Sequence, residues 1–412
     1  MRVVLHGHLG RGWLHEREIR SIVRWGGQAA GTNFPTDQSR TERPLHRWLF
    51  FPFGQVTGDC PVSPFPASAP PAPLKPVAYW LFACSAMILL MVIIGGLTRL
   101  TGSGLSMVEW APVVGWIPPI NEADWQNLFA QYRQSPEFLK INWEMDLEGF
   151  KSIFWLEFIH RVVGRLTGVV FLLPFLYFLG KRRIDRALAW QFVLMFLIGG
   201  LQGGMGWYMV KSGLVDNPHV SQYRLTAHLG IAVFLYAYML WVALGLYFGQ
   251  RQRSSNLPKH PLLGRTMALT ALIFLTLLSG GFVAGLDAGM AFNTFPLMND
   301  EWIPEGIFFL QPAYLNFFEN IATVQWNHRL LATVVFLSVS AYWWTTRRYA
   351  LSKPVAMARQ LLLLMVVIQV TLGIATLLLM VPTPLASAHQ TGAVLLLTLS
   401  LFLTHRLYHA AS

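Results

Sequence analysis

The stretch IFWLEFIHRVVGRLTGVVFLLPFLYFL, residues 153–179, decides the fold because it is an almost continuous apolar run. A helix needs about 20 mostly apolar residues to cross the hydrocarbon core of a bilayer. Glu157 and His160 lie inside this run, where a membrane penalises such side chains unless they are paired, protonated or functional. The stretch therefore predicts both a membrane helix and a site within it.

Seven other runs share this character. The predicted spans are residues 78–97, 153–179, 188–210, 224–248, 266–286, 325–345, 357–381 and 386–406. Of the 412 residues, 54% are hydrophobic and only 12% are charged, a balance typical of membrane proteins. Continuous apolar runs exclude the alternating strands of a membrane barrel. We expect an all-α polytopic membrane protein with eight transmembrane helices.

The charged residues predict how this bundle is oriented. Lys and Arg cluster in the loops after the second, fourth and sixth spans, whereas acidic residues outnumber basic ones in 98–152 and 287–324. Basic loops stay on the cytoplasmic or matrix side. Both termini are therefore predicted on that side of a bacterial cytoplasmic membrane or a mitochondrial inner membrane. The same clusters account for the net charge of +11 without a nucleic-acid partner.

Residues 1–75 form an N-terminal extension of different composition. The first part is rich in Arg, with Arg17, Arg20 and Arg24 on one helical face, and Pro, Gly and Ser dominate the rest. This pattern is typical of a mitochondrial presequence followed by a linker. An unstructured tail on a bacterial protein fits the pattern equally well.

The first outer loop contains an amphipathic pattern, EADWQNLFAQYR, over residues 122–133. Trp125, Leu128, Phe129 and Tyr132 recur at i, i+3, i+4 and i+7, which places them on one face of a helix. We expect a short helix that lies in the membrane interface or caps the bundle.

The chain also repeats itself. GGLTRLTGSG from Gly95 is echoed by GGFVAGLDAG from Gly280, EFIHR by QWNHR, QGGMG by QVTLG and TAHLG by SAHQT, always in the same order. Such an ordered echo indicates duplication. It predicts a first half, residues 76–250, and a second half, residues 251–412, each a four-helix bundle and related by a pseudo-two-fold axis along the membrane normal.

Four histidines occupy repeated positions near the outer starts of their spans, and they form two pairs: His160 with His228, and His328 with His389. Each histidine alone reads most simply as a packed polar residue that bridges to a neighbouring helix. Because the position recurs, ligation becomes the better interpretation. Two facing imidazoles suit the axial positions of a haem, whereas zinc or non-haem iron would need further ligands close by.

The halves differ three residues before the histidine, where the first has Glu157 and the second has Gln325. A carboxylate in one site and its neutral isostere in the other suggest one haem bound for chemistry and one for electrons. An ion pair between Glu157 and Arg161 is the alternative interpretation. Arg161 and Arg329 each follow a histidine and either balance haem propionates or extend to the interface.

These motifs together resemble the haem A synthase family, in its mitochondrial and proteobacterial branch. The resemblance covers residues 78–406 and rests on GGLTRLTGSGLSMVEW, EFIHRVVGR, GWYMVKSGL, SQYRLTAHLG, SGGFVAGLDAG, NTFP, WNHR and VPTPLASAHQ. It implies eight spans in two halves and oxidation of the C8 methyl group of haem O to the formyl group of haem A, for cytochrome oxidase. Some members carry a cysteine pair in the first outer loop, but residues 98–152 contain no Cys.

The resemblance also implies roles for the site residues. His328 and His389 would hold a haem b cofactor, His160 and His228 would bind the substrate haem, and the family's glutamate maps to Glu157. Our hypothesis is two successive oxidations of the methyl carbon followed by loss of water. The carboxylate would accept a proton or stabilise developing positive charge.

The haem b would pass electrons to an acceptor that the sequence does not name. Haem O synthase, cytochrome oxidase assembly factors and a second copy of the chain are further partners that this function would accommodate. Two competing classes are a di-haem b membrane cytochrome that only transfers electrons and a haem-handling transporter.

Overall fold

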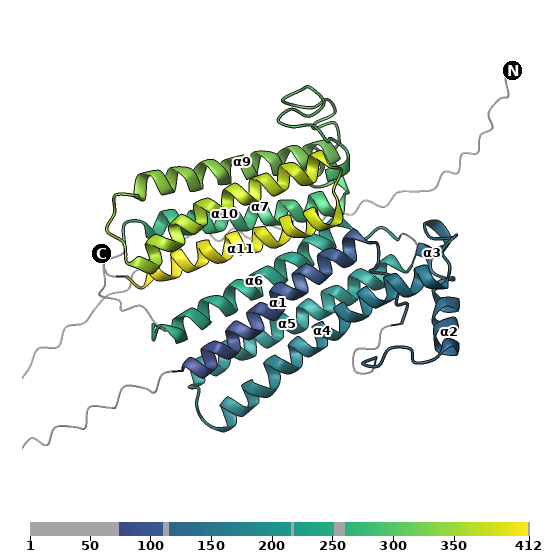
Figure 1. The fold of residues 1–412 in the computed structure, drawn as a ribbon, viewed down its shortest axis with the longest axis horizontal. Coiled ribbons are helices and arrows are strands. Elements are labelled where there is room, and N and C mark those ends of the chain that lie inside the picture. Colours follow the sequence, from purple (N-terminus) through teal and green to yellow (C-terminus); the bar gives the residue numbers. More distant parts are fainter. Residues whose placement is uncertain (1–73, 110–114, 216–217, 251–259, 411–412) are drawn as a thin grey trace, which may run out of the picture. The chain divides into compact units, whose positions relative to one another are not determined.

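The computed structural model describes residues 74–109, 115–215, 218–250 and 260–410. The regular secondary structure of these segments is helical, and they contain no β-strand. The presequence predicted within residues 1–75 lies almost entirely outside them. The long helices, shown in Figure 1, are α1 (Lys75–Leu100), α4 (Leu147–Gly180), α5 (Arg186–Gly213), α6 (Gln222–Tyr247), α7 (Leu263–Gly285), α9 (Ile321–Thr346), α10 (Lys353–Leu378) and α11 (Thr383–Tyr408).

Seven of these eight helices are long and apolar enough to cross a membrane, so the chain is an integral membrane protein. The exception is α9, which spans 26 residues but includes Gln325, Asn327 and Arg329 in its first turns. Each of the eight predicted spans coincides with a long helix. Seven of these helices are candidate membrane crossings. That α9 crosses the membrane stays a prediction.

The contacts between helices come in equivalent pairs. In the first half α1 packs against α4 and α6, and α5 packs against α6 and α4; in the second half α7 packs against α9 and α11, and α10 packs against α11 and α9. Between the halves, α1 packs against α11, α6 against α7, and α6 against α11. Figure 1 shows the start of α1 and the end of α11 at the same end of the helices.

Two equivalent glycines allow the halves to approach closely. A Cβ on Gly96 of α1 would lie 2.5 Å from Oε1 of Gln390 on α11, and a Cβ on Gly281 of α7 would lie 2.9 Å from Oγ1 of Thr226 on α6. A larger side chain at Gly96 would displace the side chain of Gln390, which donates to Val92 O at 2.7 Å, and one at Gly281 would press on Thr226. Glycine at both repeat positions therefore allows close contact between the halves.

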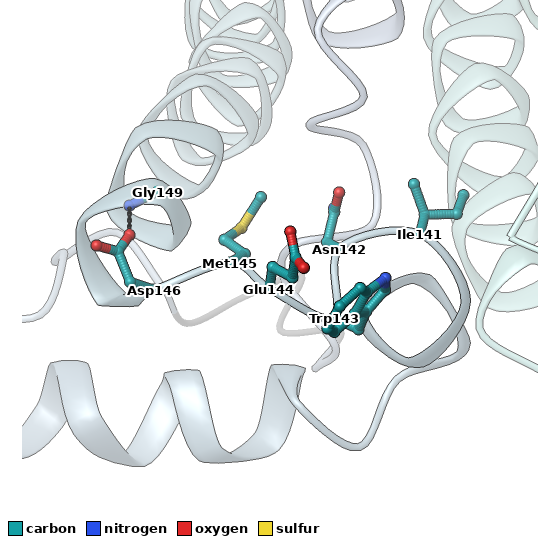
Figure 2. A pocket seen from close by; sticks show the side chains of 7 residues that line it. All are labelled: Ile141, Asn142, Trp143, Glu144, Met145, Asp146 and Gly149. Carbon is teal, nitrogen blue, oxygen red and sulfur yellow. Dashed lines mark hydrogen bonds between the residues drawn. The ribbon is translucent and has the colours of Figure 1, made fainter.

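Helix α4 begins earlier than the hydropathy predicted, at Leu147 and not at Ile153. Asp146 caps it, because its Oδ1 accepts a hydrogen bond of 2.8 Å from the backbone N–H of Gly149 (Figure 2). Hydropathy predicts only the apolar part of the helix, whereas the capping residue sets where the helix itself begins. The surrounding cavity of about 430 Å³ is lined by residues 141–146 and Gly149 alone, so it includes none of the predicted site residues.

The predicted amphipathic helix is present as α2 (Glu122–Tyr132), followed by the short α3 (Pro136–Lys140). Trp125 and Tyr132 are buried in a cluster with aromatic side chains of α4, among them Phe150 and Phe154. Of the two locations predicted for this helix, the contacts favour the one that caps the bundle. In the second half, the corresponding segment between α7 and α9 instead folds as η1 (Ala288–Met290), η2 (Ala313–Leu315) and α8 (Asn316–Glu319).

A buried carboxyl group makes this cap sensitive to pH. Glu137 of α3 is buried and accepts a hydrogen bond of 3.1 Å from the hydroxyl of Tyr132. Burial, opposed by that hydrogen bond and assisted by the charge of Glu157, raises the pKa of Glu137 from 4.5 to about 7. A raised carboxyl pKa contributes stability that is fully present below pH 4.5 and is lost as the pH rises through about 7.

We expect the backbone amides of α2 and α3 to exchange hydrogen faster at pH 8 than at pH 5.5, after correction for intrinsic rates. Between these two pH values, ionisation of Glu137 should reduce the local stability by an amount on the order of 2 kcal/mol. In the Glu137→Gln variant, protection should be the same at both pH values. Equal protection at the two pH values in the unaltered protein would show that Glu137 does not control the cap.

Candidate functional site

The second-half histidines face each other across two helices. His328 of α9 and His389 of α11 have ring centroids 6.4 Å apart and ring planes at 86°. Two iron–nitrogen bonds of about 2 Å, each continued by about 1.2 Å to a ring centre, require about 6.4 Å. The pair therefore fits bis-histidine ligation of a haem. Among the described residues no group of three or more His, Cys, Asp or Glu could hold a metal ion.

Both second-half rings form hydrogen bonds through Nδ1. Ser279 donates its hydroxyl proton to the backbone oxygen of Thr276 at 2.7 Å, so its Oγ can only accept from Nδ1 of His328 at 2.8 Å. Nδ1 of His389 lies 3.2 Å from the backbone oxygen of Gln369, to which it can donate, and 3.1 Å from the side-chain amide of the same residue, from which it can accept. The hydrogen bonds of both rings to described residues thus involve Nδ1, so Nε2 is the nitrogen that would bind iron.

The first-half histidines are arranged differently. His160 of α4 and His228 of α6 are close enough to interact electrostatically. However, Nε2 of His228 lies 3.3 Å from the side-chain amide of Gln202, and its Nδ1 is buried without a hydrogen-bond partner. The side-chain amide of Gln202 thus lies against Nε2 of His228, whereas the equivalent amide of Gln369 lies against Nδ1 of His389, at 3.1 Å.

Each of the four histidines rests against a glycine of a neighbouring helix, and these glycines are equivalent in the repeat. Side chains larger than hydrogen would crowd the rings. A Cβ on Gly95, Gly280, Gly206 or Gly373 would lie 3.4, 3.2, 3.0 or 2.8 Å from Cε1 of His160, His328, His228 or His389, respectively. We call these four glycines the glycine seats, because each leaves room for the histidine ring that packs against it.

Glu157 is buried, and both of its oxygens accept two hydrogen bonds. Oε1 accepts from Nε and Nη2 of Arg161 at 3.0 and 2.5 Å, and Oε2 accepts from the hydroxyl of Ser106 at 2.6 Å and the backbone N–H of Met107 at 2.8 Å. Arg161 also donates to the backbone oxygens of Met107 and Glu109 at 2.8 Å. The pair thus fastens the loop that follows α1.

The second half reproduces this anchor without the carboxylate. Arg329 donates to the backbone oxygens of Phe292 and Thr294 at 2.8 and 2.9 Å, which are the repeat equivalents of the two carbonyls bound by Arg161. Gln325 donates to the oxygen of Phe292 at 3.1 Å. Nε of Arg329 and Oε1 of Gln325 remain buried without partners. In both halves the arginine anchors its loop through backbone oxygens, but only in the first half does a carboxylate balance the charge of the arginine.

A cleft of about 280 Å³ opens beside the first-half pair and is lined by Arg161, Glu109, Trp207 and Lys211 among others. The Nζ of Lys211 lies 5.1 Å from the centroid of the Trp207 ring. Arg161 is the only predicted site residue that lines either of the two cavities described in these segments.

Sequence reasoning therefore predicted the histidines, Glu157 and the arginines, and the structure brings them together as two clusters. The sequence patterns alone did not single out Ser279, Gln202 or Gln369, or the four glycine seats. Both glutamines and all four glycines lay in register in the repeat, which was the available signal.

Comparison with known proteins shows the family of this chain. The model of the family COX15-CtaA, described as cytochrome oxidase assembly protein, matches residues 78–401. The heme A synthase of Nitrosospira multiformis is 54% identical over 333 residues, which are 81% of this chain and 94% of that protein. The heme A synthase COX15 of Arabidopsis thaliana is 45% identical over 82% of this chain and 76% of that protein. The chain belongs to the COX15-CtaA family of cytochrome oxidase assembly proteins.

Proposed function

We propose that this integral membrane protein is a haem A synthase, which oxidises the C8 methyl group of haem O to the formyl group of haem A for cytochrome oxidase assembly. The observation that carries this proposal is the contrast between two related sites. In the first half a buried carboxylate, Glu157, is paired with Arg161, whereas in the second half Gln325 occupies that position and Nε of Arg329 has no partner. A site with a carboxylate suits the substrate to be oxidised, and a site without one suits a resident electron carrier.

The proposed architecture is eight transmembrane helices in two four-helix halves, residues 76–250 and 251–412, after an extension over residues 1–75. The equivalent pairs of helix contacts support this division. The shared end at which α1 starts and α11 finishes supports both termini on one side (Figure 1). We assign that side to the cytoplasm or matrix because the loops at this end carry the Lys and Arg clusters.

The second half is proposed to hold haem b on His328 and His389. This group would supply a one-electron carrier for the oxidation, with a further acceptor beyond it. Arg329 has a buried Nε without a partner and no carboxylate beside it, so it suits a haem propionate. The protein's own part is to orient the two rings and to exclude water from them.

The first half is proposed to bind haem O through His160 and His228, with Arg161 beside it. Glu157 would accept the proton that leaves when water adds at the oxidised methyl carbon. Both carboxylate oxygens already accept hydrogen bonds, so accepting a proton requires Glu157 to release Ser106 or the Met107 N–H. The four donors meanwhile fix the carboxylate in one position.

Expression of the full chain in cells that make haem O but no haem A tests this function. Pigments extracted from the membranes and from the purified protein are separated by reversed-phase chromatography. We expect haem A to accumulate, and haem B to accompany haem O or haem A in the protein. Haem B alone, with no haem A in the cells, would instead identify an electron-transfer cytochrome.

A further inference from the structure

We propose that Ser279 is a positioning residue that retains the resident haem in the second half, and that Ile94 at the equivalent position leaves the first half free to exchange its haem. The inference rests on the proposed function for the identity of the two haems. Its geometric basis is independent of the reaction.

The contact of Ser279 with His328 is directional. The hydroxyl proton is donated to Thr276 O within the same helix, which leaves only oxygen lone pairs facing the imidazole. Nδ1–H of His328 can therefore donate to Ser279 at 2.8 Å, with the backbone oxygen of Thr276 as a second acceptor nearby. Such a partner of a metal-ligating histidine fixes the ring's orientation and increases the basicity of the ligating nitrogen, and its loss typically weakens metal binding by about 10–100-fold.

The first half lacks this partner. Ser279 directly precedes the glycine seat Gly280, and Ile94 directly precedes the equivalent seat Gly95. An isoleucine side chain has no atom that can accept a hydrogen bond. Haem binding in this half must therefore orient the ring of His160 without such an acceptor at this position, which favours release.

The position also affects the haem's reduction potential. An imidazole that donates from Nδ1 is more electron-rich, and this stabilises the ferric iron over the ferrous iron. Within a membrane protein no bulk water replaces a lost acceptor. Removal of the Ser279 hydroxyl should therefore raise the midpoint potential of the resident haem as well as speed its release.

The test uses the purified full-length holoprotein in detergent. Haem loss is followed after addition of excess apomyoglobin, and the midpoint potential is measured by optical titration. For Ser279→Ala we expect a rate of haem B loss about 10–100-fold above that of the unaltered protein, with a raised potential. Ser279→Thr keeps the hydroxyl and should restore both. Thr276→Val, which removes a hydroxyl bonded to Leu272 and not to the histidine, is the matched control.

The reciprocal variant, Ile94→Ser, tests the first half. A serine there can donate to its own helix and accept from His160, as Ser279 does for His328. We expect the haem O or haem A that copurifies with the protein to be lost more slowly to apomyoglobin, while haem B loss is unchanged.

An unchanged off-rate and potential in Ser279→Ala would overturn the proposal, as would equal effects of Ser279→Ala and Thr276→Val. Neither measurement depends on haem A formation. If the protein binds haem B and releases it as expected but makes no haem A, then the proposed function fails and the role of Ser279 stands.

Discussion

Glu157→Gln is expected to abolish haem A formation while the resident haem stays bound. General acid–base catalysis typically contributes about 10²–10⁴-fold to a rate, so the yield of haem A per chain should fall at least about 100-fold. The measurement is reversed-phase chromatography of pigments from cells that supply haem O. The haem B content of the purified variant should remain within about twofold of the unaltered protein.

The main objection to this variant is that it also breaks a buried ion pair with Arg161. Removing one partner of such a pair commonly costs about 3–5 kcal/mol. The second half answers this objection, because Gln325 occupies the same position and Arg329 still binds its loop carbonyls. A glutamine at 157 can donate to Met107 O in the same manner, so the loop should stay in place.

Two further variants separate catalysis from anchoring. Gln325→Glu places a carboxylate beside Arg329, as in the first half, and should lower the haem B content of the protein because the arginine would then pair with the carboxylate. Ser106→Ala removes one donor to Glu157 but keeps the carboxylate, and should lower the yield less than about tenfold, as expected for a single neutral hydrogen bond. Haem A formation at the normal rate in Glu157→Gln would show that the carboxylate only holds the loop after α1 and has no catalytic role.

Much of the helical scaffold followed from hydropathy, because about 20 apolar residues in a row leave few alternatives to a membrane helix. The aromatic face of α2 was also predicted, since Trp125 and Tyr132 recur with helical period. The start of α4 was missed because Asp146 initiates it outside the apolar run. A search for capping residues upstream of each span would have found it.

The site was predicted only where residue type alone signals chemistry. Histidines and a carboxylate in a membrane helix are conspicuous, and the repeat paired them. The structural role of the arginines could not be predicted from the sequence. Arg161 donates to backbone carbonyls more than 50 residues earlier. Because every residue has a backbone carbonyl, no residue type marks such a partner. Ser279 was missed for a related reason, since a serine in a membrane helix usually bonds to its own helix.

Gly373→Ala is expected to remove the resident haem from the protein. The added Cβ would lie 2.8 Å from Cε1 of His389, closer than such atoms approach without movement. The imidazole cannot yield freely, because its Nδ1 is bonded to Gln369 and its Nε2 must reach the iron. We expect the haem B content per chain to fall at least about tenfold, in the range typical of disturbed metal ligation.

The other seats define a graded series. Gly280→Ala brings a Cβ to 3.2 Å from His328 and should cost less haem B than Gly373→Ala, whereas Gly206→Ala, at 3.0 Å from His228, should lower haem O binding and leave haem B in place. The control is Gly204→Ala on α5, where a Cβ would meet no atom within 4 Å.

The sign of these effects distinguishes ligand displacement from general destabilisation. Alanine is a better helix former than glycine by about 1 kcal/mol, so a seat that tolerated the methyl group would make the helix more stable and retain its haem. Loss of haem B from Gly373→Ala, with the helix content and detergent stability of Gly204→Ala preserved, can therefore arise only at the ring. Haem retention in Gly373→Ala would mean that His389 is not an iron ligand in this geometry, and the pairing with His328 would have to be abandoned.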